Sequence, residues 1–270
     1  GKITSAPAAH LSVLCNQMVN FLGIMQNEWA GAQAFSSFDT YLAPFVKVDN
    51  LSYREVKKCI EAFIYGVNTP SRWGTQAPFS NITLDWTVPA DLAELPAIVG
   101  GKEMDFKYKD CKKEMDMVNR AFLEIMIEGD ANGRGFQYPI PTYSITKDFD
   151  WSDTENNRLL FEMTAKYGTP YFSNYINSDM EPSDVRSMCC RLRLDLRELR
   201  KKSGGFFGAG ESTGSVGVVT INMPRIAYLA KDEADFYARL DRMMDIAARS
   251  LKIKRGVITK LLDEGLYPYT

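Results

Sequence analysis

The sequence is poor in the residues on which many catalytic and metal sites are built. It has one histidine, His10, and five cysteines, none of which form a Cys-x-x-Cys pair. Neither a zinc ribbon nor a disulfide framework is indicated by an odd cysteine count with this spacing. A Ser-His-Asp triad would depend on His10 alone, in the first turn of a predicted helix. We therefore predict no metal site in this chain and no histidine-based triad.

Long apolar runs and a strong charge of either sign are also missing. The formal net charge is −2 at pH 7, so no basic field favours nucleic acid or a membrane surface. No apolar run approaches the roughly 18 residues of a spanning helix. Residues 1–10 do not have the charged and apolar regions of a signal peptide. We therefore expect a cytoplasmic protein with no nucleic-acid partner and no membrane partner.

The first 70 residues predict helices. Apolar side chains recur at spacings of three and four residues from Ser5 to Ala34, and a shorter helix is expected from Phe38 to Phe45. Ser52 and Glu55 have the spacing of a capping box that begins a third helix. Thr69-Pro70 is expected to end it.

After residue 70 the pattern predicts strands that alternate with long helices. The strands are expected at 79–86, 142–146, 170–176 and 216–221, and the helices at 109–130, 152–168 and 232–264. Long helices between strands imply parallel strands joined by crossovers. The predicted fold class is α/β, as an open sheet or part of a barrel, and one domain is the simpler organisation.

Two polar loops rich in proline and glycine are candidate ligand loops. They are residues 69–81, which end at Asn81, and residues 133–142. Both loops precede their strands, whereas ligands of α/β sheets bind beyond the carboxyl ends. A purely structural role therefore remains open for each, and neither has the phosphate-binding GxxxxGK[ST] pattern.

The cysteines differ in their surroundings. Cys15 and Cys59 occupy apolar positions of helical stripes and are expected to be buried, whereas Cys111 falls in a charged helix start and is expected to have no particular role. Cys189 and Cys190 are adjacent, which is chemically unusual.

The adjacent pair has both a structural and a functional interpretation. Arginines at 186, 191 and 193 flank the pair, and their charge would lower a thiol pKa and attract an anionic substrate. Two buried thiols or a strained vicinal disulfide would also explain the pair. Spacing alone leaves these alternatives open.

Six segments together resemble the anaerobic (class III, oxygen-sensitive) ribonucleoside triphosphate reductases. They follow the family's order along essentially the whole chain. They are QNEWAGAQAFSSFDTYLAPF at 26–45, WGTQAPFSNITLD at 73–85, FQYPIPTYSIT at 136–146, SMCCRLRLD at 187–195, GSVGVVTINMPRIA at 214–227 and LLDEGLYPY at 261–269.

The resemblance implies part of a ten-stranded α/β barrel of the glycyl-radical type and a thiyl radical on a central finger loop. The family motif of Met, a small residue and Cys-Arg falls on residues 188–191, so Cys190 is the expected radical cysteine, preceded by Cys189. In the family an Asn before the next strand contacts substrate, but Ser215 stands there in this chain. Asn222 and Asn81 are further substrate-binding candidates. The implied function is reduction of ribonucleoside triphosphates to 2′-deoxyribonucleoside triphosphates.

The resemblance also implies a longer protein, with this chain as a partial catalytic barrel domain. Residues 1–70 would be a mainly helical, dimer-forming flank, and the finger loop would lie near 186–195. A glycyl radical, installed by an S-adenosylmethionine iron–sulfur activase, and a structural zinc are expected outside this chain, which alone should be inactive. The implied partners are ribonucleoside triphosphate substrates, deoxynucleoside triphosphate and ATP effectors, the activase and a second copy of the protein.

Two alternatives stay open at this point. One is a formate-lyase-like glycyl radical enzyme, whose barrel also holds adjacent cysteines, although the contexts SMCCR and GVVTINMPR fit the reductase better. The other is a non-catalytic nucleotide-binding dimerisation fragment. Its polar residues would come from the first third of the chain and include Gln26, Glu28, Gln33 and Asp39.

Overall fold

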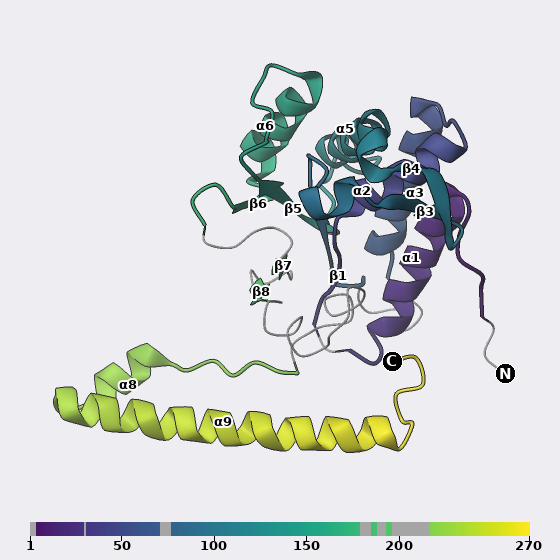
Figure 1. The fold of residues 1–270 in the computed structure, drawn as a ribbon. Coiled ribbons are helices and arrows are strands. Elements are labelled where there is room, and N and C mark those ends of the chain that lie inside the picture. The colour runs from purple at the N-terminus through teal and green to yellow at the C-terminus, as the bar shows by residue number, and fades with distance from the viewer. Residues whose placement is uncertain (1–3, 30, 71–76, 179–184, 188–192, 196–215) are drawn as a thin grey trace. The chain divides into compact units, whose positions relative to one another are not determined.

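The computed structural model describes residues 4–29, 31–70, 77–178, 185–187, 193–195 and 216–270. The chain divides into two compact units, residues 1–204 and residues 205–270. Figure 1 shows the first unit as helices beside a sheet and the second as a short helix followed by a long one.

A parallel sheet lies at the centre of the first unit. Its strands run in the order β1-β2-β5-β6, where β1 is Gln33–Phe35, β2 is Ser80–Leu84, β5 is Ile140–Ile145 and β6 is Tyr171–Asn174. Helices occupy each crossover: α2 (Phe38–Val48) and α3 (Tyr53–Asn68) follow β1, α5 (Lys112–Glu128) follows β2, and α6 (Glu155–Tyr167) follows β5. The predicted α/β class with parallel strands is confirmed.

One face of this sheet packs against a layer of helices. Helices α1 (Leu11–Met25), α3, α5 and α6 contact one another in that order. Ile82 and Tyr143 from the sheet and Phe63 and Phe122 from the helices are fully buried in one apolar core. Burying such a side chain contributes about 1.5 to 3 kcal/mol to folding. This layer therefore holds one face of the sheet in place.

The predicted caps are mostly correct. Ser52 Oγ accepts from the Glu55 backbone N–H and Glu55 Oε2 accepts from the Ser52 N–H, which is the expected capping box. Helix α6 ends at Gly168 as predicted, in the left-handed conformation. The helix was predicted to begin at residue 152, but its N-cap is Thr154, because the Thr154 hydroxyl accepts from the Asn157 N–H.

Short elements were missed by periodicity. The helix predicted to reach Ala34 ends at Met25, and β1 begins at Gln33. A hairpin of β3 (Pro96–Val99) and β4 (Lys102–Lys107) turns through Gly100 and Gly101, both at positive φ. The remaining short helices of the first unit are α4 (Ala90–Ala93) and η1 (Tyr108–Cys111).

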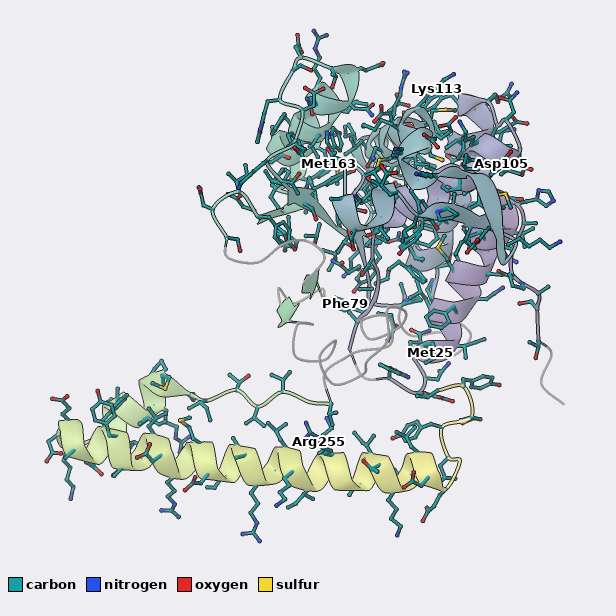
Figure 2. The ribbon with its side chains drawn as sticks, in the orientation of Figure 1. Met25, Phe79, Asp105, Lys113, Met163 and Arg255 are labelled. Atoms are coloured by element: carbon teal, nitrogen blue, oxygen red, sulfur yellow. The ribbon has the colours of Figure 1, made fainter. Side chains whose placement is uncertain are left out.

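The second unit contains α8 (Met223–Leu229) and the long α9 (Glu233–Asp263). Helix α9 confirms the helix predicted for 232–264, with Asp232 as N-cap. Side chains project from it all along its length, among them the labelled Arg255 (Figure 2). No helix among the described residues is both long and apolar enough to cross a membrane.

The strand predicted at 216–221 is wrong. These residues have no regular structure, and the Val218 side chain is 81% exposed. A strand needs a neighbour to pair its backbone N–H and C=O groups. The described part of this unit, 216–270, offers no second strand. Apolar composition alone therefore misled the prediction.

Three cysteines pack inside the first unit. Cys15 is buried and Cys59 half-buried, as expected. Cys111 is also buried, in contact with Ala43 and Met115, a packing position that its charged sequence surroundings did not indicate. Burial raises the pKa of the Cys111 thiol to about 11 and raises those of the other two as well. All three thiols are therefore protonated at neutral pH and act as apolar core groups.

Gly129, after α5, has a backbone conformation that only glycine adopts without strain. Its φ is 78° and its ψ is −165°, and an added Cβ would lie 2.5 Å from the Arg134 carbonyl oxygen. We expect Gly129→Ala to lower the free energy of unfolding by about 2 to 3 kcal/mol, measured by urea denaturation. Gly168→Ala is the control, since a Cβ there meets nothing within 4 Å, and should cost about 1 kcal/mol. Equal losses would contradict this explanation.

Glu124 of α5 ties α5 to α3. Its carboxylate accepts hydrogen bonds from Tyr53 Oη at 2.6 Å, Lys57 Nζ at 2.9 Å and Arg120 Nε at 2.9 Å. Burial opposes ionisation, but the three donors outweigh it and lower the pKa of Glu124 from 4.5 to about 2. Since the folded pKa is the lower one, the stabilisation is complete above the unfolded pKa and is lost as pH falls from about 5 towards 2.

We therefore expect Glu124→Gln to lower the free energy of unfolding by about 1 to 2 kcal/mol at pH 7. The difference from the unsubstituted chain should shrink as pH falls towards 2, which denaturation at a series of pH values would measure. Glu128→Gln is the control, because Glu128 also pairs with Lys57 but is 61% exposed. That variant should change stability by less than about 0.5 kcal/mol. A pH-independent loss in Glu124→Gln would refute the role of its charge.

Candidate active site

The sheet face that points away from the helices carries a group of polar side chains, which we call the polar face. Side chains alternate along a strand, so the residues next to core-facing Ile82 and Tyr143 lie on the opposite face. The register pairs Thr83 with Thr142 and Ser144 with Ser173. The uncharged polar side chains on this face are Asn81, Thr83, Thr142, Ser144 and Ser173. Strands covered on both faces are normally apolar on both, so this face indicates a site.

Asn81 is the predicted substrate-binding residue that the structure places on the polar face. It is completely buried, and its Nδ2 donates to Thr142 Oγ1 at 3.4 Å. Its Oδ1 is buried without a hydrogen-bond partner. An unpaired buried polar atom costs about 1 to 3 kcal/mol. Four other buried side-chain atoms of the described residues are also without a partner, so the Asn81 oxygen indicates a ligand only through its place on the polar face.

A pocket of about 580 Å³ opens at the carboxyl ends of β2, β5 and β6. This is the edge of an α/β sheet where ligands usually bind. Ser144 of the polar face lines it, together with Tyr175, and its charged residues are Asp85, Asp91, Asp148 and Lys147. Three carboxylates against one lysine make the pocket unfavourable for a phosphate group and suitable for neutral hydrogen-bonding groups.

The Asp39 carboxylate holds the rim of this pocket in place. Oδ1 accepts from the Asp85 backbone N–H at 2.8 Å, and Oδ2 accepts from the Trp86 backbone N–H and from Asn119 Nδ2, both at 2.9 Å. Asn119 Oδ1 accepts in turn from Tyr143 Oη at 2.9 Å. One buried carboxylate thus joins α2, α5 and the ends of β2 and β5.

This network also excludes one interpretation of the sequence. Asp39 is 0% exposed and its oxygens are occupied, so it is not available as an effector-binding residue. Burial raises the pKa of Asp39, whereas the donors from Asn119 and the backbone act in the opposite direction. Burial also raises the pKa of Tyr143, so its hydroxyl stays a hydrogen-bond donor.

The other predicted site residues lie elsewhere or outside the described residues. Cys189, Cys190 and Ser215 are outside them. Strands β7 (Val185–Ser187) and β8 (Arg193–Asp195) pair antiparallel, with Ser187 opposite Arg193, and residues 188–192 connect them. Asn222 caps α8 in the second unit, where its Oδ1 accepts from the Arg225 N–H at 2.9 Å.

Two further sequence candidates have structural roles. The loop at 133–142 is held by Asn68 at the end of α3, whose Oδ1 accepts from the Gln137 and Tyr138 N–H groups. His10 pairs with Asp49 through its Nδ1 at 2.8 Å, on an exposed surface. The hydroxyls of the polar face were missed, although the alternation of Asn81 with Thr83 and of Thr142 with Ser144 would have indicated them.

We expect Asp39→Asn to lower the free energy of unfolding by about 2 to 4 kcal/mol. An amide replaces one acceptor oxygen by an N–H₂ group, which would face donors that it cannot satisfy. Tyr143→Phe is the matched variant, since it removes only the outermost donor of the same network, and should cost about 1 kcal/mol. Urea denaturation compares the two, and equal losses would show that the carboxylate is not the anchor.

Comparison with known proteins gives one family. The family model for anaerobic ribonucleoside-triphosphate reductase matches residues 1–270. None of the curated proteins matches the chain. Solved structures of the Thermotoga maritima anaerobic ribonucleotide reductase are similar. The one with citrate in the active site has a TM-score of 0.71 at 23% identity and covers 98% of this chain and 46% of that one.

The same enzyme in complex with dATP and CTP has a TM-score of 0.70 at 21% identity, over 98% of this chain and 44% of that one. A further anaerobic ribonucleotide reductase has a TM-score of 0.70 at 22% identity, over 98% and 41% of the two chains. The chain therefore spans less than half the length of the structures it matches. At this identity the likeness shows the fold, which agrees with the α/β architecture above.

Proposed function

The chain belongs to the anaerobic ribonucleoside-triphosphate reductase family, and from this we propose that its protein reduces ribonucleoside triphosphates to 2′-deoxyribonucleoside triphosphates. The family match over residues 1–270 carries the proposal. The described geometry supports it in two ways. A polar sheet face lies opposite the helix layer, and paired strands flank the cysteine segment. The same match favours the reductase over a formate-lyase-like enzyme.

Cys190 is the residue to which we assign the radical. Strands β7 and β8 pair antiparallel, and the cysteine pair lies between them in the sequence. A glycyl radical supplies the unpaired electron when it is present. The Cys190 thiyl then takes the hydrogen atom from C3′ of the ribose, so an S–H bond forms as a C–H bond breaks. Replacement of the 2′-hydroxyl by hydrogen releases water and consumes two electrons and two protons from an external reductant. The Cys190 S–H then returns its hydrogen atom to C3′ and the thiyl is regenerated.

The residues of this chain would bind and orient the ribose. Asn81 is the strongest candidate, since its carboxamide lies on the polar face with an unpaired oxygen. Ser215 remains a proposed contact. Asn222 is a weaker candidate, because its side-chain oxygen already caps α8.

Other components follow from family membership. We propose deoxynucleoside triphosphates and ATP as effectors, in line with the dATP bound by the Thermotoga maritima enzyme. We also propose that the protein is a cytoplasmic homodimer with a structural zinc. An S-adenosylmethionine iron–sulfur activase would install its glycyl radical.

Substitution of the cysteines in the full-length protein tests the assignment. We expect Cys190→Ser to abolish turnover of ribonucleoside triphosphate, because a serine hydroxyl does not form the radical that abstracts hydrogen. The glycyl radical should still form, which electron paramagnetic resonance detects. Cys189→Ser is the matched control and should keep measurable turnover. The reverse pattern would assign the radical to Cys189, and turnover in both variants would exclude the cysteine pair from the chemistry.

A further inference from the structure

We propose that the Asn81 carboxamide oxygen accepts a hydrogen bond from a ribose hydroxyl of the substrate, and that Thr142 is the positioning residue that sets the orientation of this carboxamide. The inference rests on the proposed function and names two residues of the same site.

The first observation is the unpaired Oδ1 of Asn81. The side chain is 0% exposed, and of its two polar atoms only Nδ2 has a partner, Thr142 Oγ1 at 3.4 Å. A carboxamide can turn over, but with a single hydroxyl beside it one polar atom is unpaired in either orientation. Oδ1 of Asn81 is therefore left for a hydrogen bond with a group that the described chain does not supply.

The contact with Thr142 sets the chemistry of that group for the carboxamide orientation found in the structure. Nδ2 donates to Thr142 Oγ1, so the atom left for a ligand is the acceptor Oδ1. In this orientation the ligand group is a donor, whereas a phosphate oxygen at neutral pH only accepts. Thr83, on the same face, is already engaged through the Ser37 N–H at 3.0 Å. On the polar face of β2, Asn81 thus carries the unpaired acceptor, whereas Ser80 Oγ, also buried without a partner, alternates to the face that carries Ile82.

The remainder of the polar face agrees with a sugar. Its polar side chains are hydroxyls and one carboxamide, all uncharged, and they lie beside the apolar Ala34 and Ile140, the register partners of Asn81. Ser144 and Ser173 are paired in register on the neighbouring strands. Ser144 also lines the pocket at the carboxyl end, where Asp85 and Asp148 oppose a phosphate. A neutral, hydroxyl-rich group is therefore the part of a nucleoside triphosphate that this face fits.

The test compares three ligands on the full-length protein without its radical. Equilibrium dissociation constants are measured for CTP and for its 2′-deoxy and 3′-deoxy analogues. In the unsubstituted protein, loss of the contacted hydroxyl should weaken binding about 10-fold or more. In the Asn81→Ala variant, the dissociation constant of CTP should rise about 10-fold. The dissociation constants of CTP and of the analogue that lacks the contacted hydroxyl should then differ by less than about 3-fold.

Thr142 is tested by a pair of variants. Thr142→Val removes the hydroxyl that fixes the carboxamide, so discrimination between CTP and the analogue should shrink. Thr142→Ser keeps the hydroxyl and should therefore keep the discrimination between CTP and the analogue, which a merely structural role would not predict. Thr164→Val is the distant control, because the Thr164 hydroxyl bonds only the Leu160 carbonyl within α6, and should leave all three constants unchanged.

The outcomes separate this inference from the proposed function. Suppose that the radical-loaded protein reduces CTP but the Asn81→Ala variant still discriminates fully between CTP and its deoxy analogues. The inference is then overturned, because Asn81 binds ordered water only, and the reductase function stands. If the loaded protein does not reduce CTP, both are overturned. If Asn81→Ala does not fold, the Thr142 pair decides, and equal discrimination in Thr142→Val and Thr142→Ser counts against the inference.

Discussion

The buried carboxylate of Asp39 is the interaction on which the geometry of the candidate site depends. It lies at the start of α2, yet it accepts from the backbone immediately after β2 and from Asn119 on α5. A charged group in the core is costly unless its hydrogen bonds are complete, so the donors must stay where they are. Trp86 there has a φ of 64°, a conformation that a large side chain adopts only under constraint. The carboxylate thus imposes a sharp turn at the end of β2 and aligns it with the pocket.

With this edge fixed, the two faces of the sheet have separate roles. The face with Ile82 and Tyr143 carries the folding energy through the helix layer. The opposite face does not pack against the helix layer and carries Asn81, Thr142 and Ser144. Tyr143 links the two, because its ring packs in the core while its hydroxyl completes the Asp39 network through Asn119. Core packing therefore sets the register of the polar residues, since a slip of one residue would move them to the helix side.

The sequence predicted long elements well and short or partnered features poorly. The capping box at Ser52 and the helices α5, α6 and α9 follow from local rules of helix capping and periodicity. Strand β1 is short and its pattern merges with that of α1, so periodicity assigned it to the helix. At 216–221 a strand was predicted where the structure has none, because the residues of a segment do not show whether a neighbouring strand is present to pair with it. Within the site, family segments predicted Cys190, which lies outside the described residues, and the polar loop at 69–81 contributed Asn81 as a candidate. The Asp39 network depends on contacts such as that with Asn119, 80 residues away in the sequence, which no local pattern encodes.

The distribution of charge favours one orientation of the proposed substrate in the site. The polar sheet face is neutral, and the pocket at the carboxyl end of the strands carries Asp85, Asp91 and Asp148 against Lys147. A triphosphate, with several negative charges, is repelled there, and such repulsion is strongest where water is excluded. The cationic residues nearest to the cysteines in the sequence are Arg186, Arg191 and Arg193. A ribose on the neutral face with its phosphates directed away from the acidic pocket satisfies both constraints. The opposite orientation would place like charges together and leave Asn81 facing an acceptor.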